Sequence, residues 1–172
     1  MNTKTYFFPA IYSSLVILAT CITFYGGYTK YINTVSIIGL LLLVPFCVMA
    51  MIYSKRSIHN NNIGGKDLIK EGLKFVVFST IILVIFQSIF FILDFKAYKV
   101  NFFQTYGFEL AKVQIKSGHL KITEAEIPKF IEKEVAGVTL FKECTSIVFK
   151  HIFLGTITSV ITAVSIKAKL RG

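Results

Sequence analysis

The sequence predicts an all-α integral membrane protein, in which four transmembrane helices form a bundle and a helical extramembrane segment separates the third helix from the fourth. Of its 172 residues, 54% are hydrophobic and only 16% are charged, so the chain is more apolar than an ordinary soluble domain. Its charged residues are separated by long uncharged runs. Backbone polar groups have no water to bind in lipid, so we expect these runs to be helical. They lack the alternation of barrel strands.

The uncharged runs place the spans. Three runs of 25, 24 and 19 residues lie between Lys4 and Lys30, between Lys30 and Lys55, and between Lys74 and Asp94. About 20 apolar residues cross the hydrocarbon core as a helix. The fourth run, Ile152–Ile166, reaches a full span if it begins near residue 145 and Lys150 extends to the interface. In residues 1–172, taken as a single membrane domain, we predict spans at about 7–26, 33–54, 74–94 and 145–166, a connector at 55–73 and an outer segment at 95–144.

The cysteines are interpreted as apolar packing residues. Cys21, Cys47 and Cys144 are odd in number and lack the spacing of metal ligands, so no disulfide framework is expected. Cys21 ends a near match to a lipoprotein cleavage motif, Leu18-Ala19-Thr20-Cys21, and lipidation there is the alternative. We favour an uncleaved first span because its apolar stretch exceeds the usual signal core of about 7 to 15 residues.

The positive charges predict the orientation in the membrane. Loop 55–74 carries five of the Lys and Arg residues, the tail carries Lys167, Lys169 and Arg171, and the first connector has only Lys30. By the positive-inside rule both termini and this loop are cytoplasmic, N-in and C-in. Residues 95–143 hold eight lysines, but with six glutamates in a long segment, where the rule is weaker. The net charge of +10 is spread over the span ends, so lipid headgroups rather than nucleic acid are the expected partners.

The connector SKRSIHNNNIGGKDLIKEGLKF has the residue types of a binding site. A phosphate loop is excluded because Asn60 and Asp67 stand where a glycine and a hydroxyl are needed. We expect a turn over 60–65, then a short helix capped by Asp67 that leads into the third span. The segment is interpreted as a basic connector on anionic lipid.

The outer segment is expected to form two helices. The first would run over Gln104–Ser117 and stop at Gly118. Thr123 and Glu126 have the spacing of a capping box, and Pro128 favours a start of the second helix near Ile127. A small hairpin around Ser117 and Gly118 is the alternative, because VQIKSGHLKI alternates.

Polar and small residues inside the spans are the candidate functional residues. Gly155, Ser159 and Ala163 recur every four residues and predict a helix-packing face, within the bundle or between protomers. Intramembrane polar candidates for a solute path are Gln87, Thr158 and Thr162.

A second set of candidates lies near the predicted outer ends of the third and fourth spans. It consists of Asp94, Lys150 and His151. A carboxylate, an amine and an imidazole at one depth can relay protons or hold an anionic headgroup. The alternative is an interfacial salt bridge beside a packed histidine.

No catalytic, metal or cofactor site is expected from the sequence. It has no HExxH or GxSxG motif, and its three histidines are scattered.

The order of features resembles a known bacterial family. Two spans, the lead-in GGKDLIKEGLKF, a third span, a charged helical segment, and a fourth span ending in Lys-Ala-Lys resemble the four-span family DUF 4199. At Leu93-Asp94-Phe95-Lys96 the chain lacks a proline that members often have after the third span. The resemblance implies a protein of the bacterial inner (cytoplasmic) membrane with no established activity.

These observations favour a non-catalytic scaffold or accessory subunit of an envelope complex, which binds an envelope protein or a second copy of itself. The alternative is a small oligomeric transporter or channel. A membrane enzyme acting on lipid-linked substrates has no supporting motif.

Overall fold

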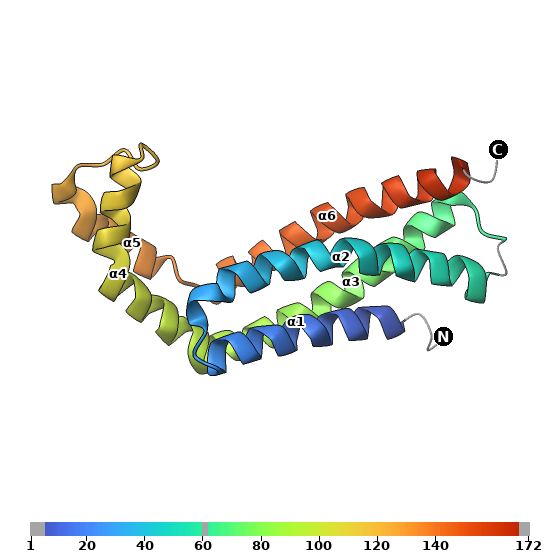
Figure 1. The fold of residues 1–172 in the computed structure, drawn as a ribbon, viewed down its shortest axis with the longest axis horizontal. Helices are drawn as coiled ribbons and strands as arrows, with labels where there is room; N and C mark the ends of the chain where they lie inside the picture. The colour runs from blue at the N-terminus through green and yellow to red at the C-terminus, as the bar shows by residue number, and fades with distance from the viewer. Residues whose placement is uncertain (1–5, 60–61, 169–172) are drawn as a thin grey trace. The chain divides into compact units, whose positions relative to one another are not determined.

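The computed structural model describes residues 6–59 and 62–168, and it confirms the all-α prediction: these residues form helices and turns, without a strand. The α-helices are α1 (Phe7–Tyr25), α2 (Ile32–Tyr53), α3 (Gly65–Phe90), α4 (Lys96–Lys116), α5 (Ile127–Ala136) and α6 (Leu140–Ala168) (Figure 1). Four helical stretches are long and apolar enough to cross a membrane, as a multi-pass membrane protein requires.

The chain, expected as a single membrane domain, divides into two compact units. The first contains α1, α2, the part of α3 up to Phe86 and the part of α6 from Ile147 onward. The second consists of residues Gln87–Ser146, including α4 and α5. We call the first the bundle unit and the second the outer unit.

The bundle unit begins with an antiparallel helix pair. α1 ends at Gly26, and Gly27 has a φ of 82°, a left-handed conformation that glycine adopts without strain. A 3-10 turn at Thr29–Tyr31 then leads into α2. The start of α1, the end of α2, the start of α3 and the end of α6 lie at one end of this unit (Figure 1). An even number of crossings therefore brings both ends of the described chain to the same side.

The connector after α2 is shorter and more helical than expected. A π-helical turn at Ser54–Ile58 extends α2, and α3 begins at Gly65. The prediction that Asp67 caps the helix is wrong, because α3 begins at Gly65 and Asp67 lies in its first turn, where a negative charge is favourable. The predicted lead-in helix is therefore continuous with the third span, and its residue Leu68 is buried.

The helix of the third span also continues much further than expected. It passes through a π-helical turn at Phe91–Phe95 into α4, so the helix expected to begin at Gln104 begins at Lys96 instead. The cause is the lack of a helix-breaking residue, since neither glycine nor proline occurs between Gly72 and Gly107. The π-helical turn changes the register of the helix without ending it.

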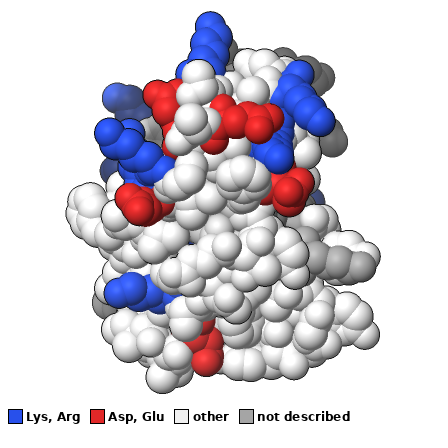
Figure 2. Space-filling view, turned by 90° about the vertical axis from the view of Figure 1, so that its left-hand side faces the viewer, with Lys and Arg blue, Asp and Glu red and all other residues white. Residues whose placement is uncertain are grey.

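The outer unit confirms the two-helix prediction and excludes the hairpin. α4 ends just before Gly118, which has a φ of 74°. The backbone amide and the hydroxyl of Thr123 both donate to the Glu126 carboxylate at 2.8 Å, and α5 begins at Ile127. Lys99 of α4 forms an ion pair with Glu143 of α6. Lysines and acidic residues are interspersed on the face shown in Figure 2.

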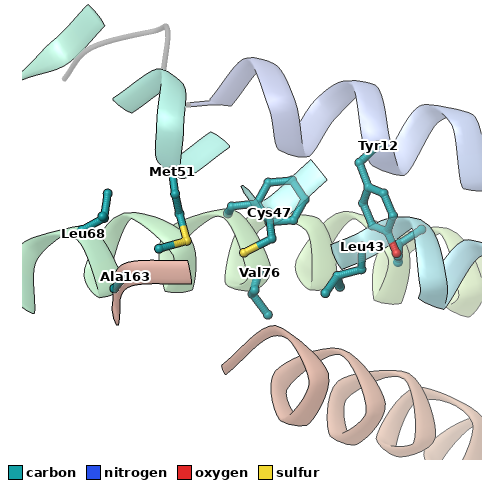
Figure 3. Packing of buried hydrophobic residues seen from close by; sticks show 9 residues of the cluster. Tyr12, Leu43, Cys47, Met51, Leu68, Val76 and Ala163 are labelled. Atoms are coloured by element: carbon teal, nitrogen blue, oxygen red, sulfur yellow. The ribbon is translucent and has the colours of Figure 1, made fainter. Parts of the chain in front are cut away.

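The core of the bundle unit is formed by side chains from all four helices. They are Tyr12, Leu43, Cys47, Met51, Leu68, Phe75, Val76, Leu83 and Ala163. Figure 3 shows Cys47 and Met51 directed from α2 toward α3, while Val76 of α3 is directed toward α6. Burial of these side chains holds the four helices together.

Candidate functional site

His151 of α6 is a buried polar residue of the bundle unit that contacts another helix. Its side chain is buried, Nδ1 lies 2.9 Å from the carbonyl oxygen of Ile147, and Nε2 lies 3.0 Å from the hydroxyl of Tyr12 on α1. The same hydroxyl lies 3.0 Å from the carbonyl oxygen of Gly39 on α2. We call Tyr12, Gly39 and His151 the core polar cluster, which joins three helices through hydrogen bonds.

The hydrogen-bond partners assign the protons of this cluster. A carbonyl oxygen only accepts, so the contact with Ile147 places the proton of a neutral imidazole on Nδ1. Nε2 is then an acceptor, and the single hydroxyl proton of Tyr12 has two acceptors, Nε2 and the Gly39 carbonyl. Both ring nitrogens of His151 are therefore occupied by groups of the chain itself.

The other two members of the outer-end prediction are placed differently. Lys150 is exposed, because neighbouring positions on a helix point about 100° apart and His151 takes the inward one. Asp94 is half-buried in the π-helical turn Phe91–Phe95 and belongs to the outer unit. That Asp94, Lys150 and His151 act together remains a prediction.

The small-residue face of α6 packs inside the bundle unit. Gly155, Ser159 and Ala163 are all buried. A Cβ atom added to Gly155 would come within 2.3 Å of Val76 Cγ2 on α3, and one added to Gly72 of α3 would come within 2.3 Å of Ser159 Oγ. These distances leave no room for a side chain, so α3 and α6 approach each other closely at both glycines. Of the two alternatives, packing within the bundle or between protomers, the structure shows packing within the bundle.

A second polar contact lies on the same face. Ser159 Oγ donates to the Gly155 carbonyl at 2.7 Å, and Cys47 Sγ of α2 lies 3.5 Å from Ser159 Oγ. Cys47 Sγ also lies 4.0 Å from the Gly72 carbonyl. These groups link α2, α3 and α6, so Cys47 is a packing residue, as the sequence predicts.

The intramembrane polar candidates have different environments. Thr158 and Thr162 are buried in the bundle unit, and Thr158 Oγ1 donates to the Leu154 carbonyl at 2.8 Å within its own helix. Gln87 is half-buried and is the first residue of the outer unit. A solute path through these residues remains a prediction.

At the connector end of the bundle unit, Glu71 has several partners. Its carboxylate accepts hydrogen bonds from Ser54 Oγ at 3.0 Å and Lys74 Nζ at 2.6 Å, and His59 Nε2 lies 4.0 Å away. These contacts tie the end of α2 to the start of α3. Charged residues in the predicted connector therefore have a structural role.

An exposed ion pair lies on the same helix. The hydrogen bond from the Lys70 ammonium lowers the pKa of the Asp67 carboxyl, and Asp67 raises the pKa of Lys70. The two residues are three positions apart, so their ion pair joins neighbouring turns at the start of α3.

Sequence reasoning missed Tyr12, Gly39 and Ser54. Tyr12 carried a usable signal, since a hydroxyl within an apolar span needs a partner. Gly39 contributes only its backbone carbonyl, and the sequence gives no sign of which backbone carbonyl accepts a hydrogen bond from a side chain. The Tyr12 and His151 positions are 139 residues apart, so nothing local pairs them.

No protein-family model matches the chain, and no curated protein or solved structure matches it either. The resemblance to DUF 4199 accordingly remains a prediction.

Proposed function

We propose that the chain is a non-catalytic protein of the bacterial inner membrane, oriented N-in and C-in, that acts as a scaffold or accessory subunit of an envelope complex. In this proposal the bundle unit is the membrane anchor. The outer unit is on the other side of the membrane from the termini, and it binds an envelope protein or a second copy.

The observation that carries the proposal is the use of polar and small residues inside the bundle unit. Across residues 6–59 and 62–168, each fully buried side-chain nitrogen or oxygen has a hydrogen-bond partner within the chain. The glycine and serine face of α6 is occupied by α3. These residues serve packing within the bundle unit, and this supports placing the binding of a partner in the outer unit.

The outer unit has the surface that such binding needs. Tyr106, Phe108, Leu110, Val113 and Phe141 are exposed there. Figure 2 shows basic and acidic residues interspersed on one face of the molecule. Mixed charge around exposed apolar side chains is typical of a protein-binding surface.

Affinity capture from native membranes in mild detergent tests the proposal. We expect the wild-type protein to retain a reproducible partner or a second copy, and replacement of Leu110 and Val113 by serine to release it. The control is Ile161→Ala, which shortens an exposed side chain of α6 in the bundle unit. Equal capture by the wild type and the Leu110 and Val113 variant would contradict the proposal.

A small oligomeric transporter or channel is the second candidate, favoured by the core polar cluster. A tyrosine and a histidine hydrogen-bonded between three spans are groups that can exchange protons. Proton flux into liposomes, abolished by His151→Gln at unchanged protein content, would support this candidate. Flux equal to that of protein-free liposomes would exclude proton transport.

A further inference from the structure

α4 has two apolar faces, and α5 covers only one of them. Gly107 and Ala111 are buried, and a Cβ atom added to Gly107 would come within 3.1 Å of Ile131 on α5. Tyr106, Leu110 and Val113 are exposed by 57%, 41% and 63%. Spacings of four and three residues place these three side chains in one row along the helix. We call this row the α4 stripe.

Two opposite charges flank the α4 stripe on the same side. Glu109 and Lys116 are seven residues apart, which is two helical turns or about 10 Å along the axis, too far for an ion pair within one helix. Neither belongs to an ion pair within residues 6–59 and 62–168. Lys112 differs from them, since its ammonium lies 4.7 Å from the ring centroid of Phe108 in the same helix.

We propose that the α4 stripe binds the α4 stripe of a second copy of this chain, as an antiparallel pair of helices related by a two-fold axis. In such a pair Leu110 of each copy lies against Val113 of the other. Glu109 of each copy then lies beside Lys116 of the other, so the dimer contains two such ion pairs. The apolar pairing and the charged pairing both place the two-fold axis near position 112. The α4 stripe and its flanking charges are therefore complementary to a second copy of themselves, which selects a second copy as the partner.

The size of the stripe predicts a weak dimer. Three apolar side chains on each helix bury less surface than a stable soluble interface needs. Confinement of both copies to one bilayer raises their effective concentration and favours pairing.

Energy transfer between donor-labelled and acceptor-labelled full-length protein in liposomes tests the pairing. We expect transfer that falls when unlabelled protein is added. Glu109→Lys and Lys116→Glu should each weaken the dimer about fivefold, because each replaces two attractions by two repulsions. The double variant should restore wild-type pairing. Lys133→Glu, with the same charge change on α5, should leave pairing unchanged.

The outcomes separate this inference from the proposed function on which it rests. Failure of the double charge exchange to restore transfer, or a monomeric wild type, would overturn the self-association. If affinity capture then still returned an envelope protein that the Leu110 and Val113 variant loses, the proposed function would stand with another partner. If the stripe variants changed neither measurement, both would fail. Unchanged circular dichroism and elution volume would show that each variant is folded.

Discussion

Tyr12 is the residue on which the centre of the bundle unit depends most. Its side chain is fully buried, and its hydroxyl reaches the carbonyl oxygen of one helix and the imidazole of another. Its ring also lies 5.7 Å from Phe75 and 5.8 Å from Phe46, measured between centroids. Polar and aromatic contacts therefore converge on one side chain, which links α1 to the other three helices.

Tyr12→Phe should lower the free energy of unfolding by about 1 to 3 kcal/mol. The ring is kept, but a buried acceptor on His151 loses its donor. Unfolding in mixed detergent micelles measures the change. Tyr28→Phe is the matched control, because Tyr28 is 58% exposed. Equal stability of the two variants would show that the hydroxyl of Tyr12 adds nothing to stability.

At the same scale, Gly155→Ala should destabilise the bundle unit by about 1 to 3 kcal/mol, despite the better helix propensity of alanine. The added methyl group would overlap the side chain of Val76. Val76→Ala provides the room, so Gly155→Ala should cost less in that background. Equal costs in the two backgrounds would contradict the close packing of α6 on α3.

At the scale of elements, patterns local in the sequence were predictable and long-range ones were not. The capping box at Thr123 and the stop at Gly118 depend on neighbouring residues, and both are confirmed. The continuity of α3 with α4 was missed because charge at Asp94 and Lys96 suggested the end of a span. Charge locates a membrane boundary, but only a helix-breaking residue or a capping contact ends the helix itself.

The candidate site was predictable only in part, for the same reason. The four-residue spacing of Gly155, Ser159 and Ala163 identified a packing face, because spacing within one helix is local information. Which helix covers that face is set by Gly72 and Val76, far away in the sequence. The partners of His151 likewise come from other helices.

The capping box of the 3-10 turn Glu124–Glu126, which leads into α5, should make the start of α5 sensitive to acid. The Thr123 backbone amide and hydroxyl lower the pKa of Glu126 below its ordinary value. Glu126 thus contributes stability above its unfolded pKa, and this contribution is lost as pH falls through the folded pKa. Chemical shifts of the Lys129 and Phe130 amides should report fraying in that acid range. Glu126→Gln should keep the box without this pH dependence, and fraying at the same pH in that variant would contradict the assignment.

At the scale of the whole molecule, the proposed function depends on which parts of the chain lie on which side of the membrane. Four helical stretches long enough to span, with the described ends at one end of the bundle unit, give an even number of crossings. The connector before α3 and the loop after α4 are then on opposite sides. Lys66, in the first turn of α3, reports the side of the connector, and Lys121 reports the side of the loop after α4; both residues are exposed.

The most direct test is labelling of single added cysteines by a membrane-impermeant maleimide in intact cells. Cys47 is buried, and Cys21 and Cys144 are partly buried, so unmodified protein provides the background. We predict labelling of Lys121→Cys in intact cells and labelling of Lys66→Cys only after the membrane is permeabilised. Labelling of Lys66→Cys in intact cells, or protection of Lys121→Cys until permeabilisation, would contradict a four-span anchor that presents the outer unit on the side opposite its termini.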